Sequence, residues 1–220
     1  MIKAVLFDMD GVIFDTEYFW KKAFYEANKK YDLTLGEDFR KTLCGKKEKA
    51  IREEMQKMFP DVNINSYRNY TREIYKHLIN VKKVPIKRGF LKLIQYLKNN
   101  NYPTALVTSS SKDRVDFLFK KSNLDVSKLF DYILTGDQVK IGKPDPFVYT
   151  EASKRLGFLP QDCMVIEDSP NGIQSSHSAG CMTIMVVDLI KPTKDLKQMC
   201  DNVFYSLNPV LKLIKKYNKC

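Results

Sequence analysis

The chain has no run of apolar residues long enough to cross a membrane. A membrane-spanning helix needs about 18 or more apolar residues in succession, and no stretch of this sequence reaches that length. The N-terminus has only a short apolar run, residues 2–7, which is too short for an export signal. We therefore expect a protein that is neither exported nor anchored and that works in the cytoplasm without a membrane partner.

The sequence also lacks a paired cysteine motif. The five cysteines include no C-x-x-C pair, and an odd number leaves one over from any set of disulfides. We therefore expect free thiols in a reducing compartment. Internal repeats and low-complexity tracts are absent as well, and the apolar fraction of 44% is too high for a disordered chain.

The sequence carries no aromatic and basic motif of the kind that binds nucleic acid, although its net charge is +11. Such an excess of positive charge suits nucleic acid, an anionic surface or small anionic substrates. The basic residues are mostly lysines in short, widely separated clusters, which favours a solvated basic surface. We expect no nucleic-acid partner, and a positive field that helps to gather phosphorylated metabolites. A monomer is expected, with an oligomer as the open alternative, because the sequence does not determine the oligomeric state.

The apolar pattern divides the chain into two parts. Residues 2–7 are predicted to form a buried strand, and from 17 to 80 apolar and aromatic residues recur only at helical spacing. After Gly89 strands and helices alternate. The predicted strands are 103–108, 132–134, 163–166 and 182–187, with a last one near 202–205, and the predicted helices are 90–97, 112–121, 146–156, 170–178 and 210–217.

This alternation predicts an α/β fold with a parallel, Rossmann-like sheet, because parallel strands need crossover helices that cover both faces. We assign residues 1–15 and 82–220 to this core and 16–81 to an inserted all-helical unit. In such sheets ligands bind beyond the carboxyl ends of the strands.

The first strand ends at two acids on alternate residues, Asp8 and Asp10, followed by Gly11. One carboxylate of such a pair can attack an electrophile while the second handles a proton. A calcium loop is the rival interpretation, but it needs oxygen ligands at regular steps, whereas 12–14 is Val-Ile-Phe. The calcium interpretation is therefore rejected.

Four hydroxyl residues, Thr108, Ser109, Ser110 and Ser111, stand between a predicted strand and a predicted helix. Ser111 or a neighbour can cap the helix. Hydroxyls and unpaired backbone N–H groups at such a junction also form an anion site, and both interpretations stay open.

Lys143 lies between Gly142 and Pro144, just before a helix for which Asp145 is the predicted cap and Pro146 the first residue. A single loop lysine is usually solvated. The neighbouring glycine and proline give this one a stiffly defined position.

Glu167 and Asp168 end another strand, with Ser169 as a predicted helix cap and Pro170 as the first helical residue. Acids so placed can simply cap a helix, but Mg²⁺ also requires carboxylate ligands of this kind. The joint occurrence decides between these interpretations: a nucleophile, hydroxyls, a lysine and two acids follow in order, each beside a strand end.

These motifs resemble those of the haloacid dehalogenase superfamily, in the branch with a helical cap inserted after the first strand. That branch holds β-phosphoglucomutase-like mutases and sugar-phosphate phosphatases. The residues that carry the resemblance are Phe7-Asp8-Met9-Asp10-Gly11-Val12, Thr108-Ser109-Ser110-Ser111, Gly142-Lys143-Pro144-Asp145-Pro146 and Val165-Ile166-Glu167-Asp168-Ser169-Pro170-Asn171-Gly172.

The resemblance implies an Mg²⁺-dependent phosphatase for a small phosphorylated metabolite that works through an aspartyl-phosphate on Asp8. Asp10 would be the general acid and base, Ser109 would bind the phosphoryl oxygens and Lys143 would offset their charge. Mg²⁺ would be held by Asp8, the backbone carbonyl of Asp10 and Asp168, with Glu167 beside it. Further substrate or phosphate contacts are assigned to Gly11, Trp20, Lys46, Lys47, Thr108, Ser110 and Asn171.

Several departures from related activities narrow this prediction. Dehalogenases and phosphonate-cleaving relatives lack the second acid, which is present here as Asp10. The mutase relatives carry a histidine after the Asp-Thr-Glu segment and an arginine in the cap loop, whereas 15–20 holds no histidine and 44–49 no arginine. Phosphatase is therefore preferred, with mutase as the alternative. A catalytically silent binding or regulatory module is the alternative of another class, against which the complete catalytic set argues.

Within the cap, substrate specificity is predicted to depend on segment 14–20 and on the loop after Gly45. Trp20 has two interpretations there. Its ring can contact the substrate, or it can pack on a helix face inside the cap, and both can hold together.

Overall fold

The computed structural model describes residues 1–43 and 48–217. The chain forms two compact units, Met1–Asp15 with Val84–Cys220 and Thr16–Lys83, which we call the core unit and the helical unit. Each unit has its own buried apolar cluster. Over the described ranges, none of the helices has both the length and the apolar character that crossing a bilayer requires.

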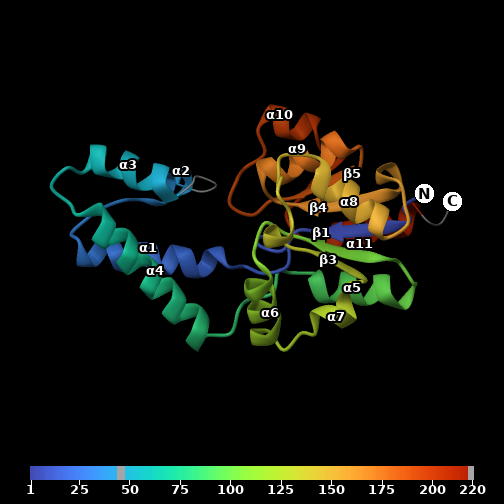
Figure 1. Cartoon of the computed structure of the whole chain (residues 1–220), viewed down its shortest axis with the longest axis horizontal. Coiled ribbons are helices and arrows are strands. Elements are labelled where there is room, and N and C mark those ends of the chain that lie inside the picture. The colour runs from blue at the N-terminus through green and yellow to red at the C-terminus, as the bar shows by residue number, and fades with distance from the viewer. Residues whose placement is uncertain (44–47, 218–220) are drawn as a thin grey trace. The chain divides into compact units, whose positions relative to one another are not determined.

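The core unit is built on one sheet of parallel strands (Figure 1). The strands are β1 (Ala4–Phe7), β2 (Thr104–Val107), β3 (Tyr132–Leu134), β4 (Cys163–Glu167), β5 (Met182–Val186) and β6 (Asn202–Phe204). Their order in the sheet is β3-β2-β1-β4-β5-β6. The chain therefore builds outward from β1 in one direction and then resumes at β4 on its other side, and in such sheets the ligand crevice lies at this switch point.

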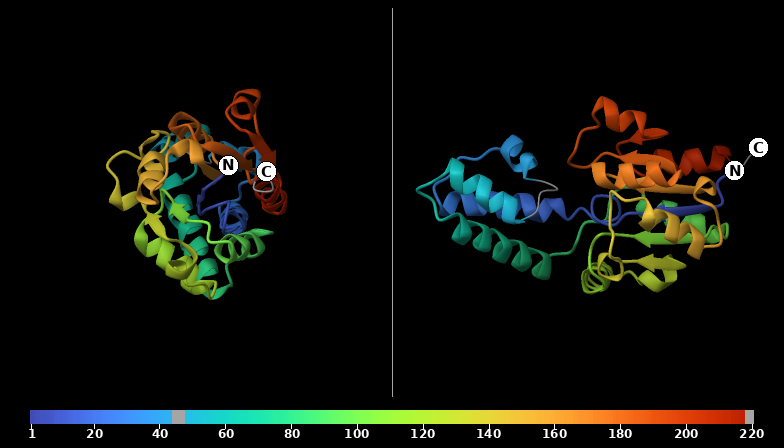
Figure 2. Two further views of the ribbon diagram at one scale, coloured as in Figure 1. Left: turned by 90° about the vertical axis from the view of Figure 1, so that its right-hand side faces the viewer. Right: turned by 45° about the horizontal axis from the view of Figure 1, so that its top comes forward.

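Helices cover both faces of the sheet (Figure 2). Those of the core unit are α5 (Phe90–Asn99), α6 (Lys112–Lys121), α7 (Val126–Leu129), α8 (Phe147–Arg155), α9 (Pro170–Ala179), α10 (Lys194–Gln198) and α11 (Asn208–Tyr217), with short 3₁₀ turns at Gly136–Gln138 and Pro160–Asp162. Ala4 and Leu6 of β1 join the cluster that includes α8, whereas the Phe7 ring lies edge-on to Phe90 of α5, with centroids 5.9 Å apart. Because both faces are buried, β1 is apolar at every position.

The helical unit consists of α1 (Glu17–Lys30), α2 (Glu37–Thr42), α3 (Glu48–Met58) and α4 (Ile64–Val81). Helices α1 and α4 lie side by side (Figures 1 and 2). The Trp20 ring of α1 stacks on Tyr75 of α4, with ring centroids 4.0 Å apart and planes 13° from parallel. This contact supports the packing interpretation of Trp20, while its substrate contact stays a prediction.

The predicted α/β fold class is confirmed, and most element boundaries agree to within a few residues. The strand predicted at 132–134 has those bounds, whereas the one predicted at 2–7 begins only at Ala4. Helices α7 and α10 were missed because elements of four or five residues are too short to show a hydrophobic period.

Of the three predicted helix caps, Ser169 caps its helix as expected and Asp145 does so from one position earlier. Ser111 does not, and another residue takes its place. The Ser169 hydroxyl accepts the Gly172 amide, as expected, and Asp145 accepts the Phe147 amide although the helix begins after Pro146. Ser111 stands at the cap position of α6 without a side-chain bond of that kind; the Asp137 carboxylate accepts the Lys112 amide instead. A residue from the loop after β3 therefore caps α6, which sequence order could not reveal.

A buried arginine joins two helices of the helical unit. The Arg40 guanidinium, 5% exposed, donates to Glu37 within α2 and to Glu17 at the start of α1, with N–O distances of 2.7 and 2.9 Å. Removal of one member of a buried ion pair leaves charge without compensation, which is costly.

We expect Arg40→Ala to lower the unfolding free energy of the helical unit by about 2 kcal/mol or more. The measurement is urea unfolding followed by the fluorescence of Trp20, the single tryptophan, which lies in this unit. Lys41→Ala is the control, because its pairing with Asp38 is solvent-exposed and should matter by less than about 1 kcal/mol. Equal effects of the two substitutions would contradict the structural role of Arg40.

Candidate active site

The carboxyl ends of β2, β1 and β4 are neighbours in the sheet, and each leads into one of the polar segments noted in the sequence. Asp8 follows β1, Thr108 follows β2, and Glu167 is the last residue of β4. Lys143 reaches the same place from the loop before α8. The structure thus brings together four segments that are far apart in sequence.

Lys143 is the centre of this group. Its side chain is 5% exposed, and its ammonium nitrogen lies 2.6 Å from Asp8 Oδ1 and 2.6 Å from Glu167 Oε1. It also donates to the backbone carbonyl of Val107 at 3.0 Å. The solvated-lysine interpretation is therefore wrong for Lys143, since its charge is buried between two carboxylates.

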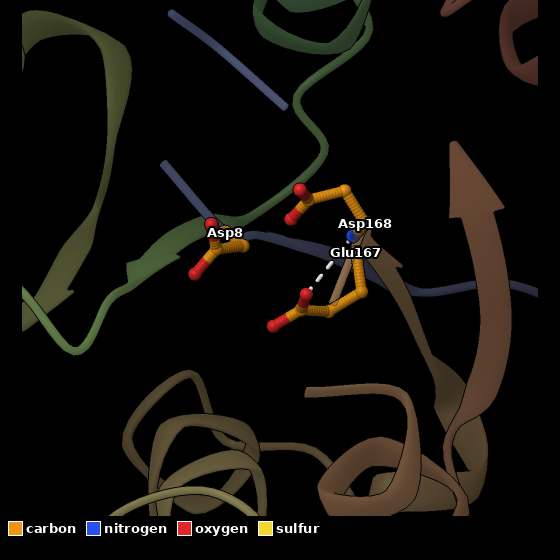
Figure 3. A group of neighbouring side chains, drawn as sticks. All are labelled: Asp8, Glu167 and Asp168. Carbon is orange, nitrogen blue, oxygen red and sulfur yellow. Dashed lines mark hydrogen bonds between the residues drawn. The ribbon is translucent and has the colours of Figure 1, made fainter. Parts of the chain in front are cut away.

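Both oxygens of Glu167 already accept hydrogen bonds. Oε1 also accepts the Tyr149 hydroxyl at 2.8 Å, while Oε2 accepts the backbone amides of Asp168 and Ser169 and the Ser169 hydroxyl. Figure 3 shows the Asp168 amide bond and the carboxylates of Asp8 and Asp168 beside it. In this arrangement Glu167 positions Lys143, and Asp8 and Asp168 offer the more available carboxylates.

Burial and neighbouring negative charges change the pKa values of the three acids. Burial raises the pKa of Asp8 to about 7, against the opposing effect of Lys143. Burial, with the negative charges of Glu167 and Asp8, raises the pKa of Asp168 well above its usual value. Burial also disfavours the ionised form of Glu167, but Lys143 outweighs it and lowers that pKa. The cluster therefore holds more potential negative charge than one lysine offsets.

The residues present fit a hard divalent cation. Oxygen atoms of Asp8, Glu167 and Asp168 lie within 4.8 Å of one another (Figure 3), and carboxylate oxygens are the ligands that Mg²⁺ prefers. A bound cation would relieve the excess of negative charge that raises the two pKa values.

Two glycines make room for this cluster. A Cβ atom at Gly172 would lie 1.7 Å from Glu167 Oε1, and one at Gly11 would lie 2.2 Å from Asp168 Oδ2. Gly11 also has a φ of +83°, a conformation that other residues rarely adopt. Neither position could accept a side chain without displacing a carboxylate.

The Asp10 carboxylate is bound by residues at the start of α6. Its Oδ2 accepts the Ser110 hydroxyl at 2.9 Å, and its Oδ1 accepts a guanidinium N–H of Arg114 at 2.8 Å. Ser110, predicted to bind phosphate, here binds Asp10. Arg114 was missed by the sequence analysis; the available signal was its position one turn into a helix that begins at the hydroxyl run.

The other residues predicted to contact substrate or phosphate differ in burial and in the unit to which they belong. Thr108 is buried, and its hydroxyl accepts a hydrogen bond from the Ser110 amide. It therefore shapes the loop of residues 108–111, which we call the hydroxyl loop. Ser109 and Asn171 are exposed, at the carboxyl edge of β2 and in the first turn of α9. Trp20 belongs to the helical unit, and Lys46 and Lys47 lie outside the described residues.

Asp188 is a second residue that sequence reasoning missed. It follows β5 at the same edge of the sheet and pairs with Lys87 at 2.6 Å, largely shielded from solvent. Its negative charge also contributes to the raised pKa of Asp168. An acid just after a predicted strand was the signal that could have identified it.

Known proteins resemble the chain in both sequence and structure. The family model of haloacid dehalogenase-like hydrolases matches residues 5–186. Phosphorylated carbohydrates phosphatase of Thermotoga maritima is 32% identical over 182 residues, covering 81% of this chain and 82% of that protein. Hexitol phosphatase A of Escherichia coli is 29% identical, covering 84% and 82%. The crystal structure of a β-phosphoglucomutase-like protein of Thermotoga maritima superposes with a TM-score of 0.79 at 27% identity, covering 98% and 99%.

The contact between Gly172 and Glu167 generates a prediction. Gly172→Ala should lower the unfolding free energy by about 1–3 kcal/mol, because the added methyl group overlaps a buried, fully hydrogen-bonded carboxylate. Thermal unfolding followed by circular dichroism measures the effect. Gly142→Ala is the matched control, since a Cβ there meets no atom within 4 Å, and it should change stability by less than about 0.5 kcal/mol. Unchanged stability of Gly172→Ala would show that Glu167 is not held as described.

Proposed function

The chain belongs to the haloacid dehalogenase-like hydrolase family, and we propose that it is a phosphatase that hydrolyses a small phosphorylated metabolite through an aspartyl-phosphate on Asp8. The observation that carries this proposal is the buried contact of Asp8 with Lys143, beside Asp168. A carboxylate in this setting can approach an anionic phosphate ester because a fixed cation offsets the charge.

In the first half of the reaction an oxygen of Asp8 attacks phosphorus. The new O–P bond forms as the bond between phosphorus and the ester oxygen breaks, and the departing alkoxide takes a proton from Asp10. Lys143 offsets the charge that gathers between Asp8 and the phosphoryl group. The exposed hydroxyl of Ser109, at the mouth of the hydroxyl loop, is suited to donate to a phosphoryl oxygen.

In the second half Asp10, now ionised, takes a proton from a water molecule that attacks the phosphorus. The bond between Asp8 and phosphorus breaks, inorganic phosphate leaves, and both carboxyl groups return to their starting states. Asp10 is suited to these transfers because its side chain is about one third exposed, whereas Asp8 is buried. It can therefore exchange protons with a substrate and with water.

The carboxylates of Asp8 and Asp168 and the backbone carbonyl of Asp10 would hold Mg²⁺, with Glu167 next to it. When bound, the ion neutralises phosphoryl oxygens and orients them for in-line attack. Glu167 would keep its bonds to Lys143 and to the backbone amides, and it would act on the cation through its charge.

The relatives favour a phosphorylated sugar or sugar alcohol as the substrate class, since two of them are named for phosphorylated carbohydrates and hexitols. We propose that the helical unit, including Trp20, Lys46 and Lys47, determines which ester is accepted. A phosphosugar mutase is the second candidate, favoured by the structural likeness to a β-phosphoglucomutase-like protein.

The deciding experiment measures phosphate release from sugar phosphates, nucleotides and p-nitrophenyl phosphate, with isomerisation of β-glucose 1-phosphate assayed alongside. We expect Mg²⁺-dependent hydrolysis that EDTA abolishes. Asp8→Asn should remove it, a loss of about 10⁴-fold or more, because the nucleophile is gone.

Isomerisation faster than hydrolysis would instead establish a mutase. A folded, Mg²⁺-loaded protein that turns over none of these compounds would favour a binding module. Hydrolysis that persists in Asp8→Asn would contradict the covalent intermediate.

Binding of Mg²⁺ can be tested without activity. The ion should raise the unfolding free energy by roughly 2.7 kcal/mol at about 100 times its Kd, and Asp168→Asn should lose most of this gain. Asp162→Asn is the matched control, because Asp162 precedes the same strand at its opposite end and pairs with Lys3. An equal Mg²⁺ effect in both variants would exclude Asp168 as a ligand.

A further inference from the structure

We propose that Arg114 is a positioning residue for Asp10: it holds the proton-transferring carboxylate at the mouth of the site and directs it for proton delivery to the leaving group. This inference rests on the proposed phosphatase function and adds to it a residue that lies outside the four motifs. The contact that carries it is the bond of 2.8 Å from Arg114 to Asp10 Oδ1.

The two oxygens of the Asp10 carboxylate are held by two residues four positions apart, at the start of α6. Ser110, which donates to Oδ2, lies just before α6, and Arg114 lies one turn inside it. Two donors from a single rigid segment fix both the place and the plane of the carboxylate. Both of these donors belong to the core unit.

Helix α6 is itself firmly anchored. The backbone amide of Lys112, the first residue of α6, donates a hydrogen bond to the Asp137 carboxylate. The Thr135 hydroxyl donates a second hydrogen bond to the same carboxylate. On the inner side of the helix, the Phe119 ring lies edge-on to Phe14, with centroids 4.9 Å apart. Phe14 ends the loop that Asp10 begins, so α6 contacts this loop at both ends and can act as a fixed reference for it.

The exposure of the ion pair suits a group that must exchange protons. The side chains of Arg114 and Asp10 are 31% and 33% exposed, whereas those of Lys143 and Asp8 are 5% and 11% exposed. An exposed carboxyl group can exchange protons with a substrate and with water. Oδ1 can keep its bond to Arg114 as the carbonyl oxygen of the protonated acid, while Oδ2 carries the proton that is delivered to the leaving group.

This assignment predicts a dependence on the leaving group. An alkoxide leaving from a sugar phosphate needs a proton, whereas p-nitrophenolate leaves readily without one, and kcat/KM reports the steps up to its departure. We expect Arg114→Leu to lower kcat/KM for the best sugar phosphate of the panel by about tenfold to a hundredfold, part of what a general acid contributes. For p-nitrophenyl phosphate the change should stay within about twofold.

Arg114→Lys should restore part of the loss, because lysine supplies the charge without the planar guanidinium. Lys120→Leu, an exposed lysine at the far end of α6, is the control and should leave both substrates unaffected. If Arg114→Leu does not fold, as judged by circular dichroism, Ser110→Ala removes the other bond to Asp10 and should show the same selective loss.

Equal losses with both esters, or no loss with either, would overturn the positioning role of Arg114. A rise in KM for the sugar phosphate with unchanged kcat would also overturn it and would assign Arg114 to substrate binding. A wild-type protein that hydrolyses neither ester would refute the phosphatase function itself, which is a result distinct from all of these.

Discussion

Lys143 places one ammonium group between the carboxylates of Asp8 and Glu167, and the rest of the site depends on this buried contact. A buried lysine is stable only when it is paired and hydrogen-bonded, and here two acids and a backbone carbonyl provide that compensation. In return, the lysine keeps Glu167 ionised and reduces the cost of a charged Asp8. The same electrostatic balance that permits folding prepares Asp8 for an anionic substrate.

The contact between Glu167 and Lys143 depends on other contacts that hold the Glu167 carboxylate in place. Gly172 lets α9 approach Glu167 closely, and the amides at the start of that helix hold one oxygen of its carboxylate. The other oxygen is thereby aimed at Lys143, with the Tyr149 hydroxyl as its second donor. A site of this kind is preorganised, because few of its groups need to move when substrate binds.

The two acids after β1 differ in their surroundings, and this difference suits the two tasks proposed for them. Asp8 is buried against a cation, as a nucleophile for an anionic ester should be. Asp10 is partly exposed and is bound by the Ser110 hydroxyl, just before α6, and by the Arg114 guanidinium of α6, as a group that exchanges protons should be. The sharp loop at Gly11 allows neighbouring carboxylates to face these different environments.

The sequence by itself determined the fold class and the four polar segments, because apolar periods and strand-end motifs are local signals. It could not show that Lys143 is buried, that Ser110 binds Asp10, or that Asp137 caps α6, since each of these contacts joins residues at least 24 positions apart. Arg114 and Asp188 were missed for a related reason: each had only a positional signal, one turn into the helix after the hydroxyl run and just after a predicted strand, and such a signal does not reveal the partner in space. Only the packing of α6 and β5 at the carboxyl edge of the sheet brings their side chains to Asp10 and beside Asp168, because a charged group acquires its role from the groups that surround it in space.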